Sequence, residues 1–173
     1  MVLTMYDVSP LGHFIERWTM DQIDRKIIRA LESDARLSFA ALAEEVNLSK
    51  AACWSRVKAM EEAGIIRGYR TELDPARLGL ELHAFVSVSI DFDHSDAFEA
   101  AVRRHPLIRH CFATAGEADY TLYILADNMS GLDMLLRGQI CRLPGVKRTI
   151  TSMVTREIKA DAPLAAAALA IGQ

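Results

Sequence analysis

Residues 49–58 carry the side chains whose types and spacing most clearly indicate a chemical role. If this stretch opens a helix that buries Cys53, Val57 and Met60, its remaining face is cationic, small or hydrogen-bonding, with no carboxylate before Glu61. Cations bind DNA phosphates, and small or hydrogen-bonding side chains approach base edges. The pattern predicts contact with DNA, and a solvated helix on a small core is the alternative. The predicted DNA-contacting residues are Ser49, Lys50, Trp54, Ser55, Arg56, Lys58 and, beyond the helix, Arg67.

Two helices joined by a very short turn are predicted to position this face. The first helix has apolar residues at i, i+3, i+4 and i+7, which together form one helical face. Ser49 is a suitable N-cap for the second helix, and Gly64 is placed to end it. Helices that close across the turn at residues 47–49 must cross steeply, as in a helix-turn-helix. The apolar residues of the first helix are Phe39, Leu42, Ala43 and Val46.

A further helix and a β ribbon complete the predicted DNA-binding domain. Thr19 or Asp21 is expected to cap the additional helix, which precedes the other two, and Thr19 with Gln22 fits a capping box. Residues 65–73 are predicted to form a ribbon, or wing, from which Arg67, Tyr69 and Arg70 reach the phosphate backbone. The alternative is that these side chains only decorate an exposed strand. Three helices and a wing would make a small domain with its own core.

The hydrophobic pattern changes after Asp74 and Pro75. From residue 83 apolar and polar residues alternate, which is typical of a half-buried strand. The elements that follow come in the order β-α-β-β-α-β, with Ser95 and Ser130 as expected helix caps, so the second domain is predicted to be ferredoxin-like and the fold class α+β. The predicted organisation is an N-terminal extension (1–19), a winged helix-turn-helix domain (20–74), a linker (75–82), a ferredoxin-like domain (83–159) and a C-terminal tail (160–173), either a loose helix or disordered.

One face of the predicted sheet is left without helices. An apolar sheet face tends to be covered, most simply by a second copy of the same chain. Two copies would also present two recognition helices to one palindromic duplex, so we expect a homodimer. The residues expected on this face are Phe85, Cys111 or Phe112, Tyr123 or Leu125, and Met153.

Composition and charge narrow the class of protein. The chain is 51% hydrophobic and 25% charged with a net charge of −3, which fits a globular protein and not a non-specific nucleic-acid coat. No apolar run approaches the ~18 residues that span a bilayer, so no membrane partner is expected. No signal peptide is evident. The three cysteines lack metal-ligand spacing and indicate thiols in a reducing cytoplasm.

No pattern typical of catalysis stands out. A Gly-rich phosphate loop, a Ser-His-Asp order and metal-ligand spacing are all missing from the sequence. The acidic cluster over residues 91–96 is explained more simply as a strand-to-helix cap than as a metal site. We therefore expect no catalytic residues, no cofactor and no metal.

Several motifs together resemble the leucine-responsive/asparagine-responsive (Lrp/AsnC) family of bacterial transcription regulators. The resemblance runs from about residue 20 to residue 160. It implies a winged helix-turn-helix joined to a ferredoxin-like effector and assembly domain. It also implies dimers that often associate into octamers, with an amino acid or related small molecule bound where dimers meet. The motifs are MDQIDRKIIRALESDARLSFAALAEEVNLS, CWSRVKAMEEAGIIRGYRTELDPARLG, AGEADYTLYILADNMSGLDML and LPGV.

The resemblance also implies roles for individual residues. Arg56 is the expected phosphate clamp. In the loop at residues 116–120, Gly116 is expected to permit positive φ or close backbone approach, Asp119 to pair with a ligand ammonium, and Tyr120 to offer its ring edge or hydroxyl. A plain hairpin turn is the alternative for this loop, and a place in the core is the alternative for Met129 and Met153. The other expected effector-contacting residues are Met129, Ser130, Ser152 and Met153.

The sequence thus predicts a sequence-specific, cytoplasmic and nucleoid-associated regulator whose partners are double-stranded DNA, further copies of itself and an amino-acid effector. Two other classes of function stay open. One is a siroheme-decarboxylase-like enzyme of the same architecture, against which the cationic helix argues. The other is an architectural, nucleoid-type protein indifferent to sequence and effector. Lys50 and Trp54 depart from the family pattern, so the sequence of the operator is not predicted. The identity of the effector is not predicted either.

Overall fold

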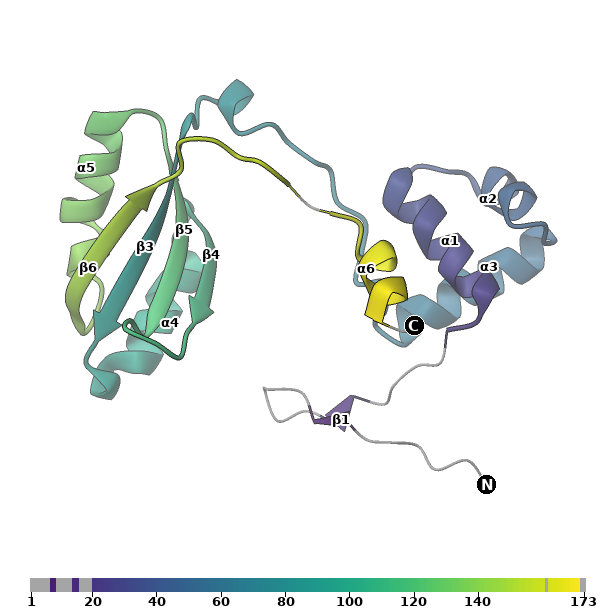
Figure 1. Ribbon diagram of the computed structural model, residues 1–173, viewed down its shortest axis with the longest axis horizontal. Coiled ribbons are helices and arrows are strands. Elements are labelled where there is room, and N and C mark those ends of the chain that lie inside the picture. The colour runs from purple at the N-terminus through teal and green to yellow at the C-terminus, as the bar shows by residue number, and fades with distance from the viewer. Residues whose placement is uncertain (1–6, 9–13, 16–19, 161, 172–173) are drawn as a thin grey trace. The chain divides into compact units, whose positions relative to one another are not determined.

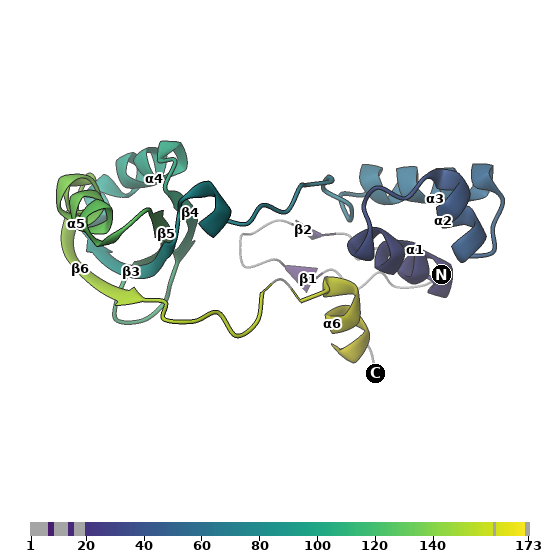
Figure 2. The ribbon, with the colours of Figure 1, turned by 90° about the horizontal axis from the view of Figure 1, so that it is seen from above.

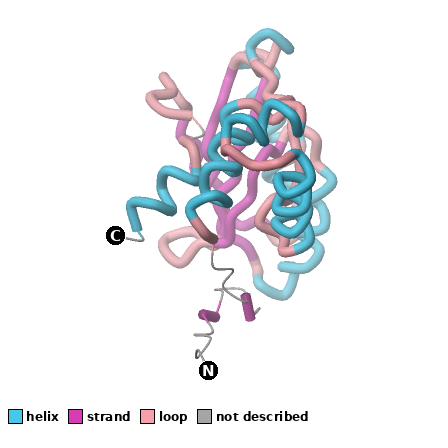
Figure 3. Tube along the Cα trace, turned by 90° about the vertical axis from the view of Figure 1, so that its right-hand side faces the viewer, coloured by secondary structure: helices cyan, strands magenta, loops and turns pink. Residues whose placement is uncertain are grey.

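The computed structural model describes residues 7–8, 14–15, 20–160 and 162–171. The chain divides into two compact units, residues 1–71 with 161–173 and residues 72–160 (Figure 1). Figure 3 distinguishes their helices from their strands. No helix in the described ranges is long and apolar enough to cross a membrane.

Three helices form the core of the first unit: α1 (Gln22–Ser33), α2 (Phe39–Glu45) and α3 (Lys50–Glu62). The apolar faces predicted for α2 and α3 are buried together with one face of α1. Asn47, in the left-handed region at φ 57°, lets the short turn between α2 and α3 close. The buried apolar residues are Ile27, Ala30, Leu42, Ala43, Val46, Cys53, Val57 and Met60.

Each of these helices begins at a side-chain cap. The Ser38 hydroxyl accepts from the Ala41 backbone N–H, and the Ser49 hydroxyl accepts from the Ala52 N–H, at 3.2 Å in both cases. Helix α1 begins at Asp21, one of the two predicted caps, which forms a capping box with Asp24. Thr19 lies outside the described residues. Ser49 therefore caps the helix that carries the predicted DNA-contacting face.

The chain leaves α3 through a glycine turn and then forms no strand. Gly64, at φ 71°, ends the helix as predicted, with Gly64 N–H donating to Glu61 O and Ile65 N–H to Met60 O. The prediction of a β ribbon over residues 65–73 is wrong, because these residues form no strand. A β ribbon needs a paired neighbour, and residues 67–73 are exposed.

The second unit is a four-stranded antiparallel sheet with two helices on one face. Its elements are β3 (Leu82–Ile90), α4 (Ser95–Arg104), β4 (Ile108–Ala113), β5 (Tyr120–Ala126), α5 (Met129–Gly138) and β6 (Val146–Met153). The strand order is β4-β5-β3-β6, which confirms the predicted ferredoxin-like β-α-β-β-α-β plan. Helices α4 and α5 lie on the same side of the curved sheet (Figure 2).

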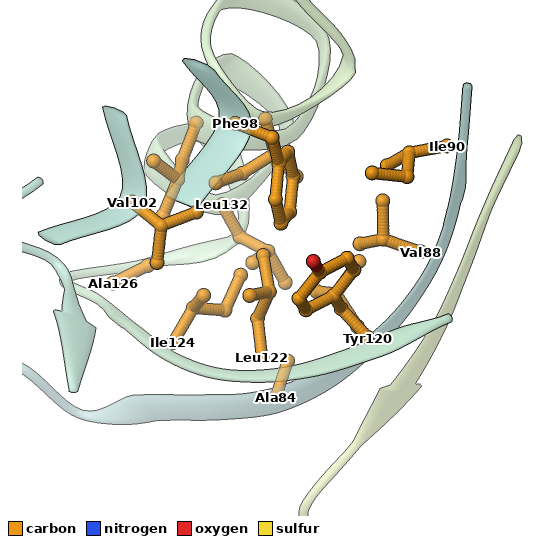
Figure 4. Close-up of a cluster of buried hydrophobic side chains, with 13 residues drawn as sticks. Ala84, Val88, Ile90, Phe98, Val102, Tyr120, Leu122, Ile124, Ala126 and Leu132 are labelled. Atoms are coloured by element: carbon orange, nitrogen blue, oxygen red, sulfur yellow. The ribbon is translucent and has the colours of Figure 1, made fainter. Parts of the chain in front are cut away.

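Alternation along the strands separates two sheet faces. Ala84, Val86, Val88 and Ile90 are buried on the helix side, together with Phe98 of α4 (Figure 4). The other side carries alternate residues of each strand and is called the open face below. Its exposed or half-buried members include Phe85, Ser87, Ser89, Phe112, Thr121, Tyr123, Arg148 and Ile150.

The register corrects several sequence expectations. Cys111 packs against the helix-side core, so Phe112 is the open-face residue of that pair. Met153 is paired with Ala84, which places it on the helix side and makes its predicted open-face position wrong. Helix α5 is capped by Asn128 and not by Ser130, and α4 begins at Ser95 without a side-chain cap.

The C-terminal tail forms a helix in the first unit. Helix α6 (Leu164–Ile171) lies beside α1. Its first backbone N–H groups, of Leu164 and Ala165, donate to the Glu32 carboxylate at 2.8 and 3.0 Å. A carboxylate at a helix N-terminus satisfies donors that lack partners within the helix. Of the two predicted states of the tail, the structure shows the helix.

Candidate DNA-binding surface and ligand pocket

The outward side of α3 presents two lysines separated by small and aromatic residues. Lys50, in the first turn, is exposed and makes no ion pair within the described residues. The ammonium of Lys58 lies 5.1 Å from the centre of the Trp54 ring and 3.7 Å from a Glu62 carboxylate oxygen. Both contacts are exposed, so they leave the lysine available to a phosphate at small cost.

Trp54 lies on the flank of this surface. Its side chain is 49% exposed. It also lines a groove of about 320 Å³ together with Leu37, Phe39 and Tyr69. Tyr69 anchors the segment after α3, because its hydroxyl donates to Glu61 at 3.0 Å. Burial, followed by this hydrogen bond, raises the pKa of Tyr69 to about 12, so the hydroxyl stays protonated.

Arg56, the predicted phosphate clamp, is paired with carboxylates of its own unit. Its Nη1 lies 2.7 Å from an oxygen of Asp21 and 2.7 Å from an oxygen of Asp24. Asp24 is only 7% exposed, and among the described residues it is the one charged residue that is buried. Hydrogen bonds to Asp24 and then Asp21 raise the pKa of Arg56. The guanidinium therefore ties α3 to the N-terminus of α1 and is engaged within the protein.

The loop between β4 and β5 is a tight turn, the alternative that the sequence left open. Thr114 N–H donates to Asp119 O, and the Thr114 hydroxyl donates to Ala118 O. Gly116 does not use the freedom expected of it: its φ is not positive, and no atom lies within 4 Å of where its Cβ would be. The turn is closed by its own hydrogen bonds.

Two predicted effector contacts are occupied by structural partners instead. The Asp119 carboxylate accepts from Ile90 N–H at 2.9 Å, which pins the loop to the end of β3. Tyr120 is 5% exposed, lies 4.7 Å from Phe98 between ring centres, and donates its hydroxyl to Glu99 (Figure 4). Burial raises the pKa of Tyr120. Both side chains are thus held by partners within the second unit, and their contact with an effector stays a prediction.

A hollow of about 260 Å³ lies between this loop and the open face. Of the predicted effector residues only Gly116 lines it. Met129 and Ser130 lie on the first turn of α5, and Ser152 and Met153 lie at the end of β6, all exposed. The residues lining the hollow are Ser87, Ser89, Thr114, Gly116, Glu117, Ala118, Thr121, Arg148 and Ile150.

The acidic cluster over residues 91–96 has a structural explanation. The Asp91 carboxylate lies 3.1 Å from Lys147 and accepts from Asp93 N–H. The hydrogen bond from Lys147 is the main reason that the pKa of Asp91 is lowered. Among the described residues, no group of three or more potential ligands is arranged to hold a metal.

Comparison with known proteins decides the family. Residues 20–67 match a family model described as winged helix-turn-helix DNA-binding, and residues 83–164 match the Lrp/AsnC ligand binding domain. A leucine-responsive regulatory protein of Salmonella typhimurium is 37% identical over 143 residues, covering 81% of this chain and 87% of that protein. The chain belongs to the Lrp/AsnC family. As an Lrp/AsnC regulator it combines a DNA-binding domain with a ligand-binding domain, as predicted.

Other relatives of this Lrp/AsnC protein agree. The regulator AldR of Mycolicibacterium smegmatis is 34% identical over 148 residues, covering 84% of this chain and 86% of that protein. A transcriptional regulator from Neisseria meningitidis, solved in complex with L-Met, superposes with a TM-score of 0.80 and 36% identity, covering 84% of this chain and 96% of that one. These matches confirm the α+β fold class and the role in transcription.

The hydroxyl-bearing and charged residues of the hollow were missed by the sequence reasoning. Ser87 and Ser89 alternate with buried residues on β3, so the strand pattern already placed them together on one face. Arg148 is paired with Ser89 across β3 and β6. These serines make one end of the predicted apolar sheet face polar. Recognising the hollow at that end required the register of β3 with both neighbouring strands.

Proposed function

We propose that this regulator binds a specific operator through α3 and that an amino acid bound in its second unit changes that binding. The observation that carries the proposal is the exposed pair Lys50 and Lys58 on a capped helix, in a chain whose net charge is −3. A local cationic surface in an acidic protein favours a directed contact over general coating. The relative solved with L-Met supports an amino-acid effector.

The proposed DNA contacts follow from the side-chain chemistry of α3 and the segment after it. Lys50, Lys58 and Arg67 neutralise phosphates, while Ser55 and Trp54 approach base edges. Ser49 holds the first turn of the helix, whose N-terminus favours a phosphate. Arg56 positions α3 and does not contact DNA. A cytoplasmic, nucleoid-associated location follows from this function, and we propose no catalytic activity.

We further propose that the open face pairs with a second copy of the chain. Phe85, Phe112 and Ile150 are 45%, 55% and 46% exposed on it, and such a patch is rarely left bare. Dimers are proposed to associate further, as in the family. Met129, Ser130, Ser152 and Met153 remain proposed effector contacts at the surface between dimers, because all four are exposed.

Placing a charge on the open face is expected to dissociate the dimer. Phe85→Asp puts an unpaired carboxylate into a surface that becomes buried on pairing, which is strongly unfavourable. Phe92→Asp is the matched control, since Phe92 is exposed but lies outside the sheet. Sedimentation velocity should show a smaller species for Phe85→Asp alone. An unchanged sedimentation coefficient in both variants would place the interface elsewhere.

The test of the proposed function is binding to the region upstream of the protein's own gene. Fluorescence anisotropy should show affinity at least about tenfold higher for this duplex than for a scrambled duplex of equal composition at physiological salt, since specific contacts add to the phosphate contribution. Equal affinity for both duplexes would instead favour the architectural alternative.

A further inference from the structure

The C-terminal helix α6 returns the chain to the DNA-binding unit after the second unit is complete. The chain leaves the first unit after residue 71, forms the second unit with residues 72–160, and rejoins the first with residues 161–173. Two segments therefore connect the units while α6 lies beside α1, and only one does when α6 is released. The match to the Lrp/AsnC ligand binding domain ends at residue 164, so α6 lies beyond the matched region.

One carboxylate, that of Glu32, holds the start of α6 against α1. One of its oxygens accepts from Leu164 N–H at 2.8 Å, and the other accepts from Ala165 N–H at 3.0 Å. Glu32 lies in the last turn of α1, where the helix dipole disfavours a negative charge. The same charge is favourable at the first turn of α6, whose N–H groups lack partners within their own helix. A carboxylate at this position thus benefits α6 and not α1.

Helix α6 depends on this contact, because it is too short to be stable alone. It has eight residues, and isolated helices below about 12–15 residues are marginal in water. Its sequence, LAAAALAI, offers no polar side chain for capping or pairing. Leu164 is 73% exposed and residues 166–168 are exposed as well, so the apolar packing of this first part of the helix is slight. We therefore expect α6 to be helical when docked and to unwind when its contact with Glu32 is lost.

We propose that α6 is a releasable strap, held by Glu32, which restrains the DNA-binding unit and thereby raises its affinity for the operator. The inference rests on the proposed function and adds a means of controlling it. Two connections leave the DNA-binding unit less freedom to turn than one does, so less freedom remains to be lost when DNA binds. Residues 154–163 keep a released α6 within about 35 Å of the end of β6, so it docks again readily.

Amide hydrogen exchange of the full chain, followed by mass spectrometry of the C-terminal peptide, tests the contact without DNA. Glu32→Gln should speed exchange over residues 164–168 by about tenfold, because two exposed, charge-assisted hydrogen bonds are weakened. Leu164→Pro removes a donor from the other side of the contact, and proline is tolerated at the first position of a helix. It should also speed exchange, and combining it with Glu32→Gln should add little.

Glu44→Gln is the matched control for the loss of charge. Glu44 is exposed and lies in the last turn of α2, within the same unit, so this variant removes a carboxylate from an equivalent position. Exchange over residues 164–168 should stay as in the wild type. Removing a negative charge from a DNA-binding unit should by itself keep or strengthen binding to the duplex.

Operator affinity, measured by fluorescence anisotropy, shows what the strap does for DNA binding. Glu32→Gln and Leu164→Pro should each weaken operator binding about threefold to tenfold, a change opposite in sign to the effect of lost negative charge alone. Both should keep the wild-type salt slope, because no phosphate contact is removed.

Three results would overturn the strap. These are wild-type exchange over residues 164–168 in Glu32→Gln or in Leu164→Pro, equally fast exchange in Glu44→Gln, and undiminished operator affinity in a variant whose exchange is faster. The proposed function fails separately, if the wild-type protein binds operator and scrambled duplexes equally. In that case amide exchange still shows whether Glu32 holds α6.

Discussion

Replacing Lys50 and Lys58 together by alanine is expected to weaken operator binding about a hundredfold, because each lysine in each copy of a dimer releases counterions from one phosphate. The same change should reduce the slope of log affinity against log salt by about 3–4, since each lost phosphate contact contributes about 0.9. Anisotropy titrations over a series of salt concentrations measure both quantities.

The control for this variant removes the same charge from the second unit. Lys147→Ala with Lys159→Ala takes away two lysines, and the exposed pair of Lys147 with Asp91 contributes little to stability. This control should keep the wild-type affinity and salt slope. Equal loss in both double variants would mean that overall charge, and not the surface of α3, governs binding to DNA.

Arg56→Ala is expected to destabilise the DNA-binding unit while leaving the salt slope unchanged. Its removal leaves the buried Asp24 carboxylate without its cation. A fully buried pair would cost ~3–5 kcal/mol, but the Arg56 side chain is 35% exposed, so we expect about 1–2 kcal/mol. For a unit of this size the melting temperature should fall by about 5–10 °C. Thermal unfolding followed by circular dichroism measures it.

Two further variants separate a positioning role from a phosphate clamp. Asp24→Asn removes the buried charge. The double variant Arg56→Ala/Asp24→Asn should therefore lose less free energy of unfolding than the sum of the losses in the two single variants. The salt slope of Arg56→Ala, taken at a temperature where the variant is folded, should equal that of the wild type. If folded Arg56→Ala protein shows a salt slope lowered by about one or two, Arg56 contacts phosphate and the original prediction of a phosphate clamp holds.

The same carboxylate network implies a loss of stability in acid. The pKa of Asp21 is lowered by the hydrogen bond from Asp24 N–H and then by Arg56. Because the folded pKa lies below the unfolded one, this stabilisation is complete above about pH 4 and is lost as pH falls through the folded value. Arg56→Ala lacks part of this lowering, so its melting temperature should depend less on pH in this range, and the difference from the wild type, measured by circular dichroism, should narrow as pH falls.

Local signals in the sequence were sufficient for part of the structure that depends on neighbouring residues. The cap at Ser49 and the glycine stop at Gly64 each involve residues within a few positions, and both are present, whereas the side-chain caps expected at Ser95 and Ser130 are not. The β-α-β-β-α-β order likewise followed from periodicity along each element. The predicted ribbon over residues 65–73 is wrong because strand formation depends on a partner, which propensity alone does not supply.

Roles that depend on distant residues were not predictable. The partners of Arg56 lie 32 and 35 residues earlier in the chain, so its spacing on α3 gave no sign of them. Tyr120 shares its face with Leu122 and Ile124, and this alternation indicated a buried tyrosine that the motif resemblance concealed. The hollow beside Arg148 needed the register of β3 with both neighbouring strands.

The central claim is that the surface of α3 meets DNA, and lysine footprinting tests it most directly. The wild-type protein would be acetylated briefly with and without its operator duplex, and the modified lysines located by mass spectrometry. We predict that the duplex protects Lys50 and Lys58 and leaves Lys147 and Lys159 as reactive as before. Unchanged reactivity at Lys50 and Lys58 in a saturated complex would contradict the account.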